Sequence, residues 1–202
     1  MKRVILTLLM LALIYTSHAQ DDKTSTDSSP NNWHFAIKGG LNYSTRAGID
    51  APGGGYLTDF HIGSIIEIPT ALDFKIQAEP QISRVGETRS GSTSHRMTFL
   101  SIPVLATVYS VDNFSFEAGP KFSFLVDERQ KTSSSGNDLA KTNRVKTLTF
   151  GLTAGASYAI DNNWVGQFRF NYTPSDIIKN NAGDTEGTSI VLFQLAIGYW
   201  LN

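Results

Sequence analysis

Residues 72–83 read LDFKIQAEPQIS and alternate apolar and polar side chains almost without interruption. The even-numbered residues are apolar, with Pro80 among them, and the odd-numbered residues are polar or charged. Successive side chains of a β-strand point to opposite faces of its sheet, so a period of two indicates a strand. This segment therefore predicts a strand with one apolar face and one polar face.

The same period recurs in seven further segments, and no helical period competes with it. The expected strands cover residues 33–43, 58–68, 72–83, 96–109, 113–126, 145–160, 163–172 and 189–201. Their connections alternate between long (44–57, 84–95, 127–144, 173–188) and short (69–71, 110–112, 161–162). An even number of strands with tight turns at one end and long loops at the other is typical of outer-membrane barrels. We therefore expect an all-β fold, an eight-stranded antiparallel up-and-down transmembrane β-barrel.

The N-terminus has the pattern of an export signal. Lys2 and Arg3 precede a continuous apolar run, and the small residues Ser17 and Ala19 mark a cleavage site. The apolar run is shorter than the roughly 20 residues that a spanning helix needs, which disfavours an uncleaved anchor. The expected organisation is a signal peptide at 1–19, a flexible polar leader at 20–32 and the barrel domain at 33–202.

Composition excludes several classes of function. The formal net charge is -1, so the chain lacks the electrostatic footprint of a nucleic-acid-binding protein. It contains no cysteine, which excludes disulfides, thiolate metal sites, cysteine nucleophiles and a lipid anchor on an acceptor thiol.

Alternation alone does not say which face lies inside. In a lipocalin-like soluble barrel the apolar face would form the core, whereas in a membrane barrel it meets lipid. The membrane arrangement is favoured because the strands are longer than the usual 5–6 residues of soluble ones. Aromatic residues also lie near both strand ends, as the two membrane interfaces require.

The polar face carries both signs of charge at the middle of the strands. Eight strands enclose a space only wide enough for side chains, and buried charges must pair. We therefore expect a plugged lumen without a diffusion pore. The predicted lumen charge network consists of Lys38, Glu67, Lys75, Glu79, Glu117, Lys121 and Arg169.

No motif predicts an enzyme, a cofactor or a metal site. The best catalytic candidate is His95, which follows Ser92 and shares a predicted loop with Glu87, a set of residue types that hydrolases use. Serine is abundant in all the long loops, so this set is weak. The glycine-rich residues 51–55 precede no helix and indicate a loop tip rather than a phosphate cradle.

Four short motifs occur in order along the chain: FAIKGGLN (35–42), FHIG (60–63), LSIPV (100–104) and AGP (118–120). In these motifs the sequence resembles the PorT-type outer-membrane β-barrel domain of Bacteroidetes. The resemblance implies an eight-stranded outer-membrane barrel and supplies no catalytic residues. A member of that family takes part in protein secretion and gliding. The chain departs from the usual barrel ending, because it closes on YWLN without a terminal Phe.

These observations predict a non-enzymatic protein of the cell outer membrane. Its expected partners are outer-membrane lipid and an envelope protein bound through the four long loops, since loops on a rigid scaffold carry most recognition. It would be structural or partner-binding. The alternatives are an accessory component for transport or protein secretion in an envelope complex and, less favoured, a lipid-modifying enzyme.

Overall fold

The computed structural model describes residues 33–47, 55–70, 74–89, 93–111, 113–132, 139–141, 145, 147–174 and 189–201. The predicted signal peptide and leader lie outside these residues. Within the described ranges, no helix has the length and apolarity needed to cross a membrane.

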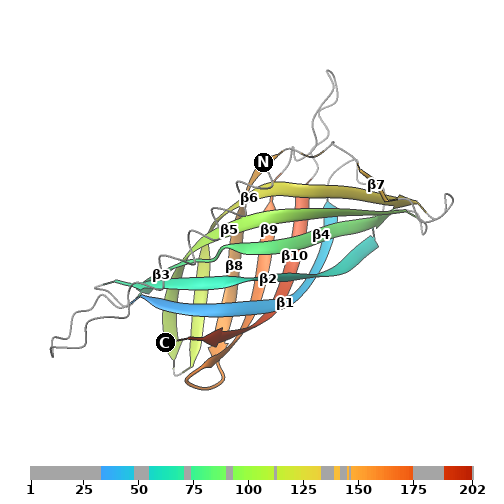
Figure 1. Cartoon of the computed structure of the whole chain (residues 1–202). Helices are drawn as coiled ribbons and strands as arrows, with labels where there is room; N and C mark the ends of the chain where they lie inside the picture. The colour runs from blue at the N-terminus through green and yellow to red at the C-terminus, as the bar shows by residue number, and fades with distance from the viewer. Residues whose placement is uncertain are drawn as a thin grey trace, which may run out of the picture.

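The described residues form one antiparallel sheet that closes on itself (Figure 1). Its strands are β1 (His34–Ala47), β2 (Gly55–Pro69), β3 (Phe74–Ala78), β4 (Gln81–Arg89), β5 (Thr93–Val111), β6 (Phe114–Thr132), β7 (Leu139–Lys141), β8 (Leu148–Ala159), β9 (Trp164–Thr173) and β10 (Ser189–Trp200). Closure comes from β1, which pairs with β2 on one side and with β10 on the other. Because β3 and β4 share one position in the wall and β7 only extends the edge of β6, the ring has eight positions. The predicted eight-stranded up-and-down barrel is confirmed.

The predicted strand 72–83 is divided into β3 and β4 at Glu79 and Pro80. Proline has no N–H to donate to a neighbouring strand, so regular pairing stops there. The wall nevertheless stays continuous. The Glu79 N–H donates to the carbonyl of Pro103 at 3.0 Å, and the Ser64 N–H donates to the carbonyl of Pro80 at 3.0 Å.

Several strands continue into segments predicted as loops. β5 and β6 are each 19 residues long and stay paired as far as Thr93 and Thr132. The sequence marked only the part of each strand that has an apolar outer face. Beyond that part the outer face is polar, for example at Ser94 on β5 and Arg129 on β6, so the alternation disappears although the ladder continues.

The two faces of the wall are inverted relative to a soluble barrel. Phe116 and Phe168 are 57% and 50% exposed, whereas Glu79 and Arg169 are 0% and 1% exposed. Exposed aromatics include Trp164 and Tyr199 near the short turns and, near the long loops, Tyr43 and Tyr56, which stack at 4.5 Å. An apolar exterior around a polar interior is the arrangement expected in lipid.

Candidate functional site in the barrel lumen

A cluster of four charged side chains fills the middle of the lumen. The Lys38 Nζ donates to Glu79 Oε2 at 2.6 Å, and the Arg169 Nη2 donates to Glu79 Oε1 at 2.7 Å. A second bond joins Arg169 Nη1 to Glu79 Oε2, and Arg169 Nε donates to Glu117 Oε1 at 2.5 Å. All four side chains are buried.

This central ion cluster crosses the full width of the barrel. Arg169 lies on β9 and Glu79 between β3 and β4, on opposite sides of the ring. Lys38 and Glu117 come from β1 and β6, which are also opposite each other. Burying these charges costs several kcal/mol per ion unless each finds a close partner, so the cluster locks four wall positions together.

Gly155 on β8 makes room for the Arg169 side chain. The two residues are paired across β8 and β9. A Cβ at position 155 would lie 2.7 Å from Arg169 Cγ and 2.4 Å from the Phe168 carbonyl oxygen. The absence of a side chain at 155 therefore lets Arg169 reach across β8 toward Glu117 on β6.

We expect Gly155→Ala to lower the free energy of unfolding by about 1–3 kcal/mol, since the added methyl displaces backbone and Arg169 together. Gly166→Ala is the matched control, because its Cβ would find no atom closer than 3.8 Å and should change stability by less than about 0.5 kcal/mol. Urea unfolding in lipid vesicles, followed by tryptophan fluorescence, measures both. Equal losses in the two variants would contradict the assigned role of Gly155.

A second polar layer lies on the long-loop side of the cluster. Lys121 Nζ donates to Asn171 Oδ1 at 3.1 Å, and Asn171 Nδ2 donates to Gln194 Oε1 at 3.0 Å. Gln194 Nε2 donates in turn to Asn42 Oδ1 at 2.9 Å, and Asn42 Nδ2 donates to Ser83 Oγ at 2.9 Å. A continuous chain of hydrogen bonds, made mainly by amide side chains, thus connects β6 to β4 across this layer.

A third polar group surrounds Glu67 near the short turns. Glu67 Oε1 accepts from Lys75 Nζ at 2.5 Å, and Oε2 accepts from Gln77 Nε2 at 2.8 Å and from the Tyr109 hydroxyl at 3.0 Å. His34 Nδ1 lies 3.2 Å from Glu67 Oε1.

The structure therefore divides the seven predicted residues into three groups. Lys38, Glu79, Glu117 and Arg169 come together in the central ion cluster. Glu67 and Lys75 form a separate pair at the rim. Lys121 faces the lumen but is held by the Asn171 amide, and no ion pair with a described carboxylate accompanies that bond.

The sequence did not predict an apolar plug in the loop-side half of the lumen. It consists of Val85, Met97, Phe99, Val145, Ile190 and Leu192. Beside it, His95 Nε2 lies 2.9 Å from Glu128 Oε1, and Arg46 pairs with Glu87. Val85 and Glu87 continue the inner face of the predicted strand 72–83 at a spacing of two, and this is the signal that would have extended that strand. Met97 and Phe99 lie within the predicted strand 96–109, on the face that was expected to be polar.

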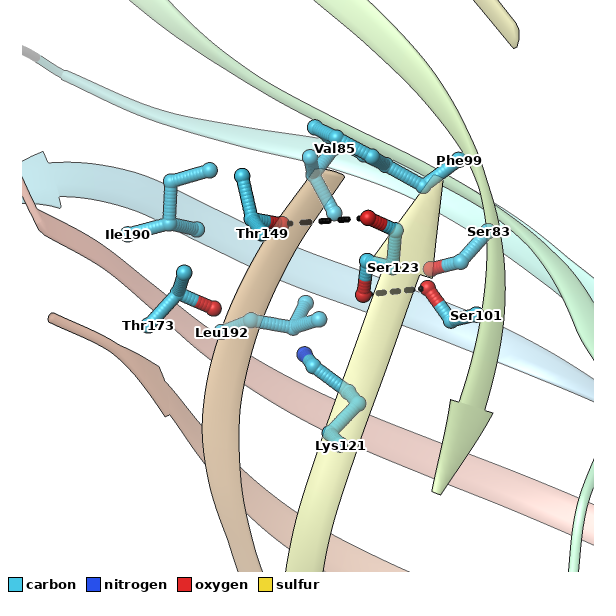
Figure 2. Close-up of a pocket in the computed structure, with 10 residues that line it drawn as sticks. All are labelled: Ser83, Val85, Phe99, Ser101, Lys121, Ser123, Thr149, Thr173, Ile190 and Leu192. Carbon is cyan, nitrogen blue, oxygen red and sulfur yellow. Dashed lines mark hydrogen bonds between the residues drawn. The ribbon is translucent and has the colours of Figure 1, made fainter. Parts of the chain in front are cut away.

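A small internal cavity of about 10 Å³ lies between the plug and the second polar layer. Figure 2 shows Lys121 below it, with Ser101, Ser123 and Thr149 around it and Phe99 above. Ser101 and Ser123 share a hydrogen bond of 2.9 Å. A space of this size holds about one water molecule, far less than a solute passage.

The structure describes two of the three residues in the catalytic candidate from the sequence. His95 lies on β5 against Glu128, and Glu87 on β4 pairs with Arg46, although Glu87 and His95 are register partners. Ser92 lies outside the described residues. Within the described part of the chain, no group of three or more His, Asp or Glu side chains could hold a metal ion.

Comparison with known proteins gives the family. The outer membrane protein beta-barrel domain family matches residues 18–179. No curated protein matches the sequence. Among solved structures, Neisserial surface protein A (NspA) aligns over 82% of this chain and 96% of its own, with a TM-score of 0.55 and 11% identity. Ail, the attachment invasion locus protein of Yersinia pestis, aligns over 84% of this chain and 99% of its own, with a TM-score of 0.52 and 11% identity.

At such identities the solved structures show the fold alone, and the family match supplies the relationship. The closed eight-position ring, the apolar exterior and the paired charges inside it agree with that match. The chain belongs to the outer membrane protein beta-barrel domain family, and it is a small outer-membrane β-barrel protein.

Proposed function

We propose that the protein is a closed, non-enzymatic barrel that does not conduct solutes and that binds an envelope partner through its long extracellular loops. The PorT-type relationship remains our finer assignment within the family. It would place such a partner in a secretion or transport complex.

The observation that carries this proposal is the central ion cluster. Arg169 and Glu79 meet from opposite sides of the ring, and the amide layer and the apolar plug lie above them. Three successive layers of buried side chains leave the loops and the outer wall as the surfaces available for recognition.

Closure is tested by adding the purified full-length protein to planar bilayers. We expect no stepwise single-channel current under conditions in which a porin conducts readily, because buried paired charges occupy the cross-section. Reproducible current steps that scale with the amount of folded protein would contradict a closed lumen.

Partner binding is tested by replacing residues 48–54, 133–138 and 175–188, one segment at a time, with a two-residue Asn-Gly turn. The predicted long connection 84–95 is omitted, because β4 and β5 stay paired as far as Arg89 and Thr93 and leave three residues between them. Each variant should keep the gel shift on boiling that a folded barrel gives, since the described strands are unchanged. At least one replacement should abolish chemical crosslinking to the envelope protein that the parent chain captures in membranes. If every shortened variant captured the same protein as the parent, recognition through the loops would be wrong.

A further inference from the structure

A hollow on the outer wall of the barrel is lined by three arginines. Its volume is about 280 Å³, and its lining residues are Arg84, Arg96, Thr98, Asp127 and Arg129. They come from the neighbouring strands β4, β5 and β6. We call this feature the arginine hollow. It has no role in the closed lumen or in the loops, so it requires its own explanation.

The arginine hollow lies directly beyond the apolar band on the same outer face. Arg84 follows the exposed Ile82 by two positions on β4, and Asp127 follows the exposed Val126 on β6. Arg84 also lies over the ring of the exposed Phe60, 5.2 Å from its centroid. The hollow is at the long-loop end of the strands, which in outer-membrane barrels faces the cell exterior. It therefore lies at the depth of the outer-leaflet headgroups.

Like charges stand opposite each other in this hollow. Arg96 and Arg129 are register partners on β5 and β6, and Arg84 is the register partner of Thr98 beside them. Directly opposed like charges on neighbouring strands destabilise a sheet. Such an arrangement is favourable when an anion lies between the guanidinium groups.

Two carboxylates compensate the arginines only in part. Asp59 lies 3.5 Å from Arg84 Nε and 3.3 Å from Arg96 Nε, and Asp127 Oδ2 lies 2.6 Å from Arg129 Nε. Three guanidinium groups facing two carboxylates leave one net positive charge. Each of these contacts is made through Nε, which leaves the paired terminal nitrogens to form the fork that binds phosphate oxygens.

We propose that the arginine hollow binds a phosphate group carried by a lipid headgroup of the outer leaflet. Guanidinium groups at the edge of the apolar band lie at the depth of the lipid headgroups, and phosphate is the anion that headgroups supply there. The bound lipid would fix the rotation and depth of the barrel in the membrane. This inference goes beyond the proposed function and does not depend on the loops or on lumen closure.

The test uses the full-length chain in phosphatidylcholine nanodiscs titrated with lipid A, a glycolipid that carries phosphomonoesters. Native mass spectrometry measures the lipid A that remains bound to the protein. The variant Arg84→Gln/Arg96→Gln/Arg129→Gln should bind lipid A about tenfold more weakly or worse, because charge-assisted contacts are lost. Unchanged retention in this variant would overturn the proposal.

A second variant gives an effect of opposite sign. Asp59→Asn/Asp127→Asn removes both compensating carboxylates and should strengthen lipid A retention, whereas a merely structural role of the cluster would weaken it. Should the triple variant fail to fold, two separate variants replace it, the single variant Arg129→Gln and the carboxylate variant. Arg129 is chosen because its side chain is the most exposed of the three arginines. Inorganic phosphate at the concentration of lipid A should not displace the lipid. Displacement at equal concentration would show a free-phosphate site and contradict the headgroup assignment.

Discussion

Replacing Arg169 with methionine is expected to lower the free energy of unfolding by about 3–5 kcal/mol, the cost of removing one partner from a buried ion cluster. Glu79 would keep only Lys38, and Glu117 would lose the one ion pair that it makes within the described residues. Methionine preserves much of the side-chain volume, so the loss reports on charge rather than on a cavity.

Urea unfolding in phosphatidylcholine vesicles measures this loss, and Arg129→Met is the matched control. Arg129 makes its ion pair with Asp127 on the exposed outer wall, where such pairs contribute less than about 1 kcal/mol. The double variant Arg169→Met/Glu117→Gln should recover part of the stability, because the stranded carboxylate becomes neutral. Similar small losses for Arg169→Met and Arg129→Met would mean that the central ion cluster does not hold the barrel together.

Replacing Phe168 with arginine is expected to lower the free energy of unfolding by about 2–4 kcal/mol, the cost of a basic side chain on the lipid face near the bilayer midplane. Phe168 lies midway along β9 and is half exposed on the outer face. The variant should insert poorly and migrate as unfolded protein on an unboiled gel.

Two controls distinguish the cost of a charge facing lipid from the cost of losing the aromatic side chain of Phe168. Phe168→Leu keeps an apolar surface and should cost less than about 1.5 kcal/mol. Ile160→Arg places the same charge beside the short turn after β8, where the cost near an interface should fall to about 0–1 kcal/mol. If Ile160→Arg were as harmful as Phe168→Arg, depth in the membrane would not govern the effect.

Much of the fold follows from local alternation. The apolar even-numbered residues of 72–83 and the mixed charges beside them predicted both a strand and its inward face, and Glu79 is indeed fully buried. The alternating lengths of the connections predicted the up-and-down order. All seven predicted lumen charges lie on the inner face for the same reason, because a period of two fixes the face of every residue once one is known.

The grouping of those charges could not be predicted, because it depends on the stagger between strands that closure imposes. Arg169 meets Glu79 from the far side of the ring, and nothing in the sequence relates those two positions. The same stagger places Lys38 and Arg169 beside the carboxylates of Glu79 and Glu117. Lys121 lies closer to the long loops and binds the Asn171 amide instead. The apolar plug was missed because Met97 and Phe99 interrupt a polar inner face.

The central claim is that the apolar outer face meets lipid, and the absence of cysteine from the chain allows it to be tested directly. Single cysteines are introduced at Phe116, Phe168 and Leu195, spin-labelled, and studied by power saturation in vesicles. Collisions with oxygen, which concentrates in lipid, should be frequent at all three positions, and collisions with a water-soluble nickel complex should be rare. Frequent collisions with the nickel complex and rare collisions with oxygen at these positions would contradict the account.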